Sequence, residues 1–202
     1  MKNFILSLVI LLGVQSFAIA QKDDDEKKGF KKENFFTGGS ISLSFSSYSF
    51  LVGGNPVFGY SLAKWADVGI VGNYTYSSFR DYPYLGDRLH QTVYGGGFFT
   101  RLFPVRFLFL QGQIEHNWMG STYFPYDNST RQKTNLASNS LLVGAGYTTG
   151  RDPSGKSVYG YLAVLWDVMN DRNSPYVDNY GRAIPIIRAG FNVALFQGKG
   201  GR

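Results

Sequence analysis

The sequence contains no cysteine, only two histidines and few charged residues. Without cysteine the chain has no disulfide bonds, no thiol chemistry and no site for a cysteine-linked lipid anchor. Asp, Glu, Lys and Arg make up 17% of the 202 residues, whereas a soluble domain has about 25%. The chain is therefore short of the side chains that keep a large protein surface in water.

Aromatic residues and glycine are plentiful instead. Phe, Tyr and Trp make up 17% of the chain, which also contains 25 glycines. Aromatic side chains are enriched in strands, so this composition indicates β-structure rather than a helical bundle. A hydrophobic content of 44% excludes a chain that is disordered throughout.

The first twenty residues are typical of a signal peptide. Lys2 precedes an apolar run over residues 4–18, and Ala18 and Ala20 form the small-x-small pattern that signal peptidase recognises. The run of about 15 residues is shorter than the roughly 20 that a membrane-spanning helix needs. We therefore predict that residues 1–20 direct export and are cleaved after Ala20.

Residues 21–34 are rich in both acids and bases, and we expect a flexible, charged periplasmic segment there. The triplet Asp23-Asp24-Asp25 has the carboxylates of a possible metal site. It lacks a turn glycine and further oxygen donors at fixed spacing, which favours a solvated charge run.

From residue 35 onward, apolar and polar residues alternate with a period of two in segments separated by turn signals, the pattern of strands. The predicted strands span 35–45, 55–63, 67–77, 92–102, 107–118, 139–148, 157–167 and 185–196. Short turns at 63–66, 103–106 and 149–156 alternate with longer loops at 46–54, 78–91, 119–138 and 168–184. An even number of strands with short turns at one end and long loops at the other is typical of an outer-membrane barrel.

The placement of charge indicates which solvent the barrel meets. Within the interiors of the predicted strands we find only Arg101, Glu115 and Arg188, with Asp167 at the rim, and all four lie on the more polar face. An arginine or lysine facing lipid at the middle of a membrane costs about 2–4 kcal/mol, which explains why the other face carries none. We predict an all-β, eight-stranded antiparallel up-and-down transmembrane β-barrel over residues 35–196, followed by a tail at 197–202.

Three groups of residues are candidates for function. A barrel of eight strands is just wide enough for its own side chains, and buried charges must be paired. We therefore expect a polar network in the interior, formed by Arg101, Glu115, Arg188 and Asp167. Interfacial aromatic girdles are expected to include Trp65, Phe103, Trp118 and Trp166. Long loops supply candidate contact residues, which can equally pack on one another over the mouth: Tyr123, Phe124, Tyr126, Tyr176 and Tyr180.

Three segments carry a family resemblance: residues 36–45 (FTGGSISLSF), 141–147 (LLVGAGY) and 185–191 (PIIRAGF). With them the chain resembles the bacterial outer-membrane β-barrel domain family, the small eight-stranded barrels of the OmpA/OmpX type. The resemblance implies residence in the bacterial outer membrane, contact with its lipid and lipopolysaccharide, insertion by the barrel-assembly machinery, and both termini in the periplasm. One departure is that Phe196 is out of phase with Phe191 and Val193, whereas many family members end on an aromatic residue in phase with the lipid-facing side chains.

The sequence favours a protein that is not an enzyme. His90 and His116 are the only histidines, and no phosphate loop, zinc motif or dinucleotide fingerprint is present. No cofactor, metal site or nucleic-acid partner is indicated, because the positive charge is dispersed. We expect a structural, adhesive or accessory role through the long loops, with subunits of a larger membrane complex as partners. The alternatives are a periplasmic lipocalin-like carrier with its apolar faces turned inward, and a narrow porin.

Overall fold

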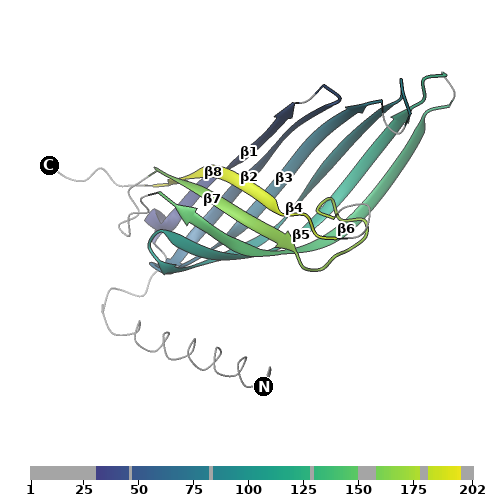
Figure 1. Cartoon of the computed structure of the whole chain (residues 1–202). Coiled ribbons are helices and arrows are strands. Elements are labelled where there is room, and N and C mark those ends of the chain that lie inside the picture. The colour runs from purple at the N-terminus through teal and green to yellow at the C-terminus, as the bar shows by residue number, and fades with distance from the viewer. Residues whose placement is uncertain are drawn as a thin grey trace. The chain divides into compact units, whose positions relative to one another are not determined.

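Figure 1 shows the computed structural model, which describes residues 31–45, 47–81, 84–127, 130–149, 158–177 and 182–196. A short 3-10 helix, η1 (Lys32–Asn34), precedes eight strands. These are β1 (Phe35–Phe45), β2 (Ser49–Ala63), β3 (Ala66–Arg80), β4 (Arg88–Val105), β5 (Leu108–Phe124), β6 (Gln132–Thr148), β7 (Val158–Asp167) and β8 (Ile186–Ala194). The predicted signal peptide, residues 21–30, Tyr180 and the tail at 197–202 lie outside the described residues.

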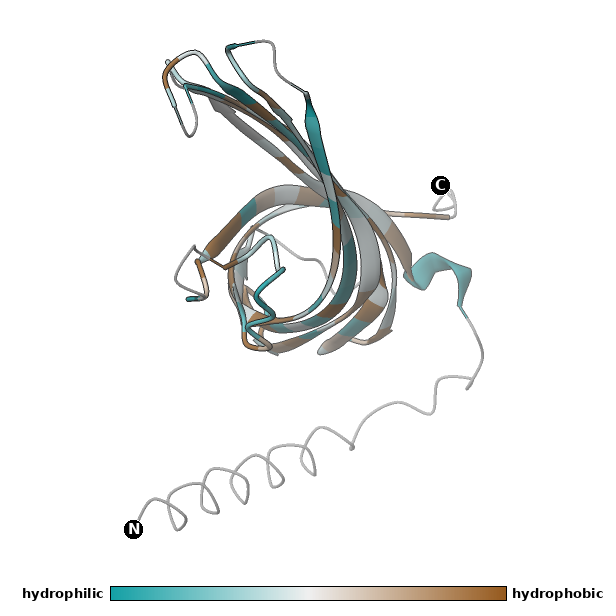
Figure 2. Ribbon diagram, turned by 90° about the vertical axis from the view of Figure 1, so that its right-hand side faces the viewer, coloured by the Kyte–Doolittle hydropathy of each residue, from teal (hydrophilic) through white to brown (hydrophobic). Residues whose placement is uncertain are grey.

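The eight strands form one closed ring. Each strand pairs antiparallel with the next, and β8 pairs with β1. We call this last ladder the seam; it runs from Phe36 opposite Ala194 to Ser40 opposite Gly190. Figure 2 shows the ring, and the predicted all-β fold of eight antiparallel up-and-down strands is confirmed. No helix in the described part of the chain is long and apolar enough to span a bilayer.

The strands are longer than predicted at one end of the barrel. Most of the predicted loop 119–138 is strand, because β5 continues to Phe124 and β6 begins at Gln132. The predicted loop 78–91 is likewise shortened by β3 and β4, and the loop 46–54 by β2. These strands continue beyond the seam, where the ring is no longer closed. Their sequences there lack the clear apolar alternation that marks a strand with one buried face.

We call this projecting part of the sheet the arm. It lies beyond the ends of β7 and β8, as Figure 1 shows for β3 to β6. It comprises residues 49–54, 77–80, 88–93, 119–124 and 132–138. The arm therefore replaces the flexible loops predicted from the sequence with paired strands.

The 3-10 turn η1 falls within the segment predicted to be flexible. Asn34 in η1 donates a side-chain hydrogen bond of 2.9 Å to the carbonyl oxygen of Ser61. This contact attaches residues 32–34 to the end of β2. These three residues thus form a turn with a contact to β2, and the flexibility of the segment 21–34 stays a prediction.

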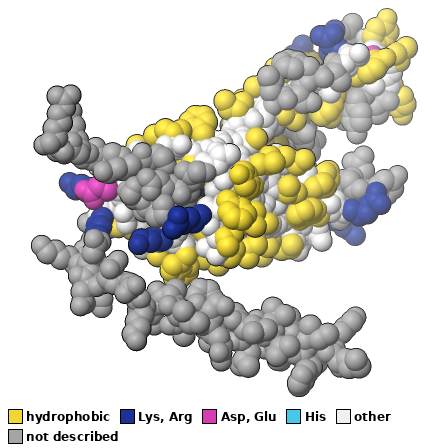
Figure 3. Space-filling model, turned by 60° about the vertical axis from the view of Figure 1, so that its left-hand side comes forward, with side chains coloured by type: hydrophobic (Ala, Val, Ile, Leu, Met, Phe, Trp, Pro, Cys, Tyr) yellow, Lys and Arg dark blue, Asp and Glu magenta, His cyan; other side chains and the backbone are white. Residues whose placement is uncertain are grey.

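The two faces of the sheet differ as the alternation predicted. Apolar side chains point outward, with Phe98 71% and Ile114 61% exposed, whereas Gln113 and Glu115 on the inner face are 2% and 1% exposed. In Figure 3 hydrophobic side chains cover the middle of the wall, and lysines and arginines gather toward its two ends. The alternative of a lipocalin-like carrier is wrong on this point, because its apolar faces would line the interior.

Close approach of neighbouring strands requires glycine at particular inward positions. A Cβ atom added to Gly97 in β4 would collide with the carbonyl oxygen of Ile114 in β5. A Cβ atom on Gly112, which faces outward in β5, would meet nothing within 4 Å. Backbone atoms cannot move aside without breaking the ladder, so Gly97 sets the spacing of β4 and β5.

We predict that Gly97→Ala lowers the free energy of unfolding by about 1–3 kcal/mol, the usual cost of overpacking. Gly112→Ala is the matched control and should leave the free energy nearly unchanged. Urea unfolding of the barrel in detergent micelles, followed by tryptophan fluorescence, measures both. Equal effects of the two substitutions would contradict the packing argument.

Candidate functional site in the barrel interior and mouth

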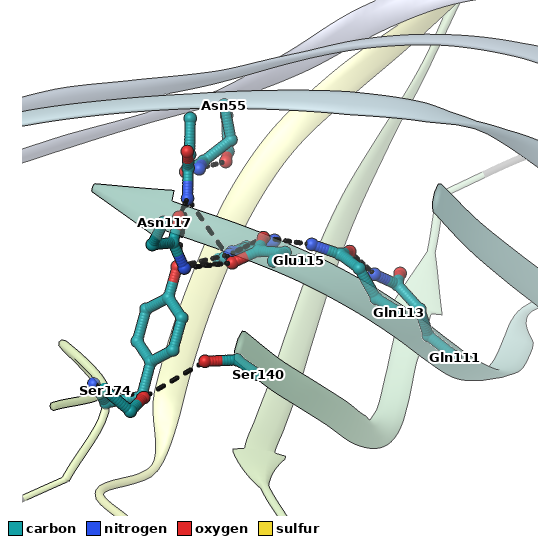
Figure 4. A network of polar contacts seen from close by, with 11 residues as sticks. Asn55, Gln111, Gln113, Glu115, Asn117, Ser140 and Ser174 are labelled. Carbon is teal, nitrogen blue, oxygen red and sulfur yellow. Dashed lines mark hydrogen bonds and ion pairs between the residues drawn. The ribbon is translucent and has the colours of Figure 1, made fainter. Parts of the chain in front are cut away.

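A row of amide and carboxylate side chains runs along the inner face of β5. Because residues two apart in a strand share a face, Gln111, Gln113, Glu115 and Asn117 all point inward. The side-chain nitrogen of Gln111 donates to Gln113 at 2.6 Å, that of Gln113 donates to Glu115, and that of Asn117 donates to Glu115 at 3.2 Å. Figure 4 shows the row, which fills the centre of the ring with connected polar groups.

Glu115 is the centre of this network. Arg188 of β8 forms an ion pair with Glu115 at 3.1 Å, and the side-chain exposures of the two residues are 7% and 0%. The hydroxyl of Tyr176 donates to the other carboxylate oxygen at 2.8 Å, and the amide of Asn73 donates to it at 3.3 Å. A buried carboxylate needs this many donors because it has given up its hydration.

Arg101 does not contact Glu115 directly. Its Nε donates to Gln111 at 2.8 Å, so two glutamines separate the arginine from the carboxylate. The guanidinium lies over three aromatic rings, at 4.7 to 5.2 Å from the centroids of Phe99, Phe109 and Tyr161. The prediction that Arg101 contacts Glu115 together with Arg188 is therefore wrong for Arg101. Arg101 is linked to Glu115 only through the two glutamines, and its guanidinium is surrounded by aromatic rings.

Asp167 holds the chain that follows β7. Its carboxylate accepts hydrogen bonds from the backbone nitrogens of Leu141 and Met169 and, at 2.6 Å, from the hydroxyl of Ser174. The carboxylate thus binds donors of β6 and of its own loop. Asp167 is a loop anchor rather than a partner of the arginines, which corrects the predicted role.

The segment between β7 and β8 enters the mouth of the barrel. Ser174 is buried and shares a hydrogen bond of 3.1 Å with Ser140 of β6, as Figure 4 shows, while Tyr176 reaches Glu115. Tyr176, predicted as a loop contact, therefore faces the interior. Above it lies a cavity of about 1090 Å³, open at the mouth, between residues 172–177 and the inner face of the arm.

The predicted girdle residues divide into two groups. Trp65, Trp118 and Trp166 are all more than 40% exposed, and Trp118 stacks on Tyr94 with ring centroids 5.6 Å apart. Phe103 is only 6% exposed and packs against Phe109 inside the barrel. Its assignment to a girdle is wrong, because β4 continues to Val105 and carries Phe103 on the same inward face as Phe99.

The remaining predicted contact residues lie at the tips of the arm. The hydroxyl of Tyr123 donates to Asp87, and the backbone nitrogen of Tyr126 donates to the same carboxylate at 2.9 Å. The hydrogen bond from Tyr123 lowers the pKa of Asp87 below its ordinary value, and acceptance by Asp87 raises the pKa of Tyr123 to about 12. The lowered pKa stabilises the folded tip above about pH 4 and the raised pKa stabilises it below about pH 10.

Phe124, at the end of β5, points to the outer face and lies between two basic groups. Its ring centroid is 4.9 Å from that of His90 and 4.9 Å from the guanidinium carbon of Arg131. Tyr123 and Phe124 are therefore strand residues rather than loop residues, whereas Tyr126, which is 76% exposed, lies in the turn.

Sequence reasoning missed the buried charges of Asp67 and Asp87, and it made too little use of one pattern. Asp67, fully buried in β3, lies directly opposite Arg101 in the β3–β4 ladder. Its place as the first residue of a predicted strand, next to a turn, gives no sign that it is buried. The alternation of Gln111, Gln113 and Glu115 was visible in the sequence, and it marks the polar row more clearly than the charges do.

His116 is on the outward face of β5, on the same side of the strand as Ile114 and Trp118. Its Nδ1 lies 2.7 Å from the side-chain oxygen of Asn139, and its ring meets Trp118 edge-on with centroids 4.5 Å apart. The imidazole is thus held by an amide and an indole at the outer wall.

We predict that Arg188→Met lowers the free energy of unfolding by about 3–5 kcal/mol, because it leaves a buried carboxylate without its cation. The double variant Glu115→Gln/Arg188→Met should recover most of this loss. Urea unfolding in detergent micelles measures both, with Arg172→Met in the exposed loop as the control. A double variant no more stable than Arg188→Met would contradict the pairing.

The comparisons with known proteins are sparse. The chain matches no protein-family model and no curated protein sequence. Among solved structures it is similar to Ail, the attachment invasion locus protein of Yersinia pestis, with a TM-score of 0.40 and 11% sequence identity. That match covers 78% of this chain and 94% of Ail.

Proposed function

We propose that this chain is an integral β-barrel of the bacterial outer membrane. We further propose that it is not an enzyme, and that it acts as an adhesive or accessory subunit through its arm. The observation that carries the proposal is the uncharged outer wall. In the described strands every outward-facing charged side chain lies in the arm: Arg80, Arg88 and Lys133.

The outer wall below the arm has the chemistry of a lipid-facing surface. Phe58, Ile70, Phe98 and Ile114 lie side by side across β2 to β5 and are all more than 40% exposed. In water such a row would be an aggregation surface. A closed barrel satisfies all its ladder hydrogen bonds internally, which makes it one of the two architectures that can cross a bilayer.

The filled interior favours a structural barrel over the alternative of a narrow porin. The polar row of β5, the Glu115–Arg188 ion pair and Tyr176 occupy the centre of the ring. Water-filled channels belong to barrels with many more strands. We therefore propose that no solute passes and that the work is done at the outer end.

The arm offers a backbone surface for a partner. β6 pairs with β7 only from Leu142 onward, so residues 132–138 have a strand neighbour on the β5 side alone. The backbone nitrogen of Asn139 donates to Asp171 in the loop after β7, and that of Leu141 donates to Asp167 at the end of β7. By the same alternation, the N–H groups of residues 133, 135 and 137 point away from β5. An open edge of this kind accepts an extended segment of another protein as an added strand.

Insertion in the membrane is tested by a charge on the outer wall. We expect Ile114→Arg to lower the free energy of unfolding in phospholipid vesicles by about 2–4 kcal/mol. Asn135→Arg, on the outward face of the arm, is the matched control and should have little effect. The measurement is urea unfolding monitored by the loss of heat-modifiable gel mobility.

If Ile114→Arg were as stable as Asn135→Arg, or if the exported protein were soluble without detergent, the membrane proposal would be wrong. Either result would place the row around Ile114 in water.

The partner proposal is tested at the edge of β6. Asn135→Pro/Ala137→Pro removes two edge N–H donors while the bonds to β5 stay in place. We expect the wild-type barrel to retain a stoichiometric companion protein on purification from its own membranes in mild detergent, and this variant to lose it. Lys133→Gln is the control, because it changes a side chain on the same edge and keeps the backbone N–H donor. A wild-type barrel that purifies alone would count against the accessory role.

A further inference from the structure

A cleft opens on the outward face of the arm, away from the barrel interior. Its volume is about 430 Å³, and it lies across β2, β3 and β4 near their outer ends. Its lining combines hydroxyls, aromatic rings and cationic groups: Ser47, Tyr48, Ser49, Phe50, Tyr76, Ser78, Arg80, Arg88 and His90. Among the residues that the structure describes, no acidic residue lines it.

Two arginines face each other at the edge of this cleft. Arg80 at the end of β3 is directly opposite Arg88 at the start of β4. Like charges opposite one another in a ladder repel and destabilise the pair. Within the described residues neither guanidinium has an ion pair or a side-chain hydrogen bond; the backbone nitrogen of Arg80 donates to the carbonyl oxygen of Tyr48.

The nearby acids are engaged elsewhere. Asp81 accepts a hydrogen bond of 2.7 Å from the backbone nitrogen of Gly86, and Asp87 accepts from Tyr123 and Tyr126. Both carboxylates thus hold the turn and the arm tip. The repulsion between Arg80 and Arg88 is left for an external anion to relieve.

The depth of the cleft indicates where that anion comes from. Tyr74, Tyr94 and Trp118 form an outward aromatic row across β3 to β5, typical of the margin of a membrane barrel. Arg80 lies six residues beyond Tyr74 on the same face, about 20 Å along a tilted strand. This position is beyond the acyl chains and level with the polar headgroups of the outer leaflet.

We propose that the cleft binds the phosphate of an anionic membrane lipid between Arg80 and Arg88. Guanidinium groups bind phosphate through paired N–H donors, and the bound charge removes the repulsion between the two arginines. The tyrosine and serine hydroxyls of the lining bind the remainder of the headgroup. The proposal rests on the insertion of the barrel in the outer membrane, and it adds a specific lipid contact at the outer end of β3 and β4 in the arm.

The experiment measures lipid retention by native mass spectrometry of the barrel released from nanodiscs. The nanodiscs contain equal amounts of phosphatidylcholine and of bis-phosphorylated lipid A. We expect wild type to retain lipid A selectively. Arg80→Gln and Arg88→Gln should each lower this retention about fivefold, the effect of removing one cation near a charged lipid surface. Arg80→Lys/Arg88→Lys, which keeps the charge, should retain more lipid A than Arg80→Gln/Arg88→Gln.

The matched control is Lys64→Gln/Arg106→Gln, which removes two positive charges from the turns at the opposite end of the barrel. Equal losses in this variant and in Arg80→Gln/Arg88→Gln would overturn the proposal, because they would show attraction by net charge alone. Displacement of lipid A by inorganic phosphate at the same concentration would overturn it as well, since the site would then take free phosphate. A barrel that enters nanodiscs without selectivity refutes the lipid site only, whereas a barrel that does not enter them refutes the proposed function too.

Discussion

Closure of the sheet at the seam is the constraint from which the other features follow. The ladder between β1 and β8 extends only from Phe36 to Ser40 on the β1 side. It fixes a ring of eight strands, whose radius leaves room for side chains and little else. It also limits the height of the closed ring, because β7 and β8 stop where longer strands on the other side continue. The filled interior and the arm are thus two consequences of one short ladder.

The interior shows how a narrow ring accommodates charge. Arg188 arrives from β8 and Glu115 from β5, on opposite parts of the wall, and their ion pair spans the ring. Such a pair contributes little net free energy against an apolar filling, but it strongly disfavours any register that separates the two charges. A slip of one residue in either strand would carry a charge to the outer wall. The polar core therefore specifies the register that leaves the outer wall apolar.

The sequence predicted the closed ring and its two faces because period-two alternation is strongest where the two faces of a strand have different surroundings. In the ring the inner face packs on other polar side chains, and the outer face is the apolar wall. The prediction failed where that contrast disappears or where local backbone overrides parity. In the arm residues 120–124 of β5 and 132–137 of β6 are half-buried or exposed on both faces, so their sequence shows no clear alternation and predicts a loop. The nearness of Phe103 to a turn predicts a girdle position, but β4 continues to Val105 and keeps Phe103 on the same inward face as Phe99.

Phe196 illustrates the local override most clearly. By parity it is out of phase with Phe191, yet its backbone is left-handed, with φ of 53°, and its ring is 64% exposed. The ring meets Phe35 edge-on, with centroids 6.3 Å apart. One residue of unusual conformation therefore brings the last described aromatic to the outer wall, where the alternation had placed it inside. Composition carries no signal for such a residue, because for any side chain other than glycine a positive φ is set by its surroundings.

The segment between β7 and β8 explains why some tyrosines of the predicted loops face the interior and others face outward. On this side the wall ends early, so the loop itself must complete the mouth. Asp167 fixes its start, and Ser174 and Tyr176 supply the polar groups that a longer β7 would have provided. Tyr176 is consequently committed to Glu115, whereas Tyr126, at a tip supported by strands on both sides, is free to face outward. A tyrosine in such a loop is available to a partner only where the strands beneath it already close the wall.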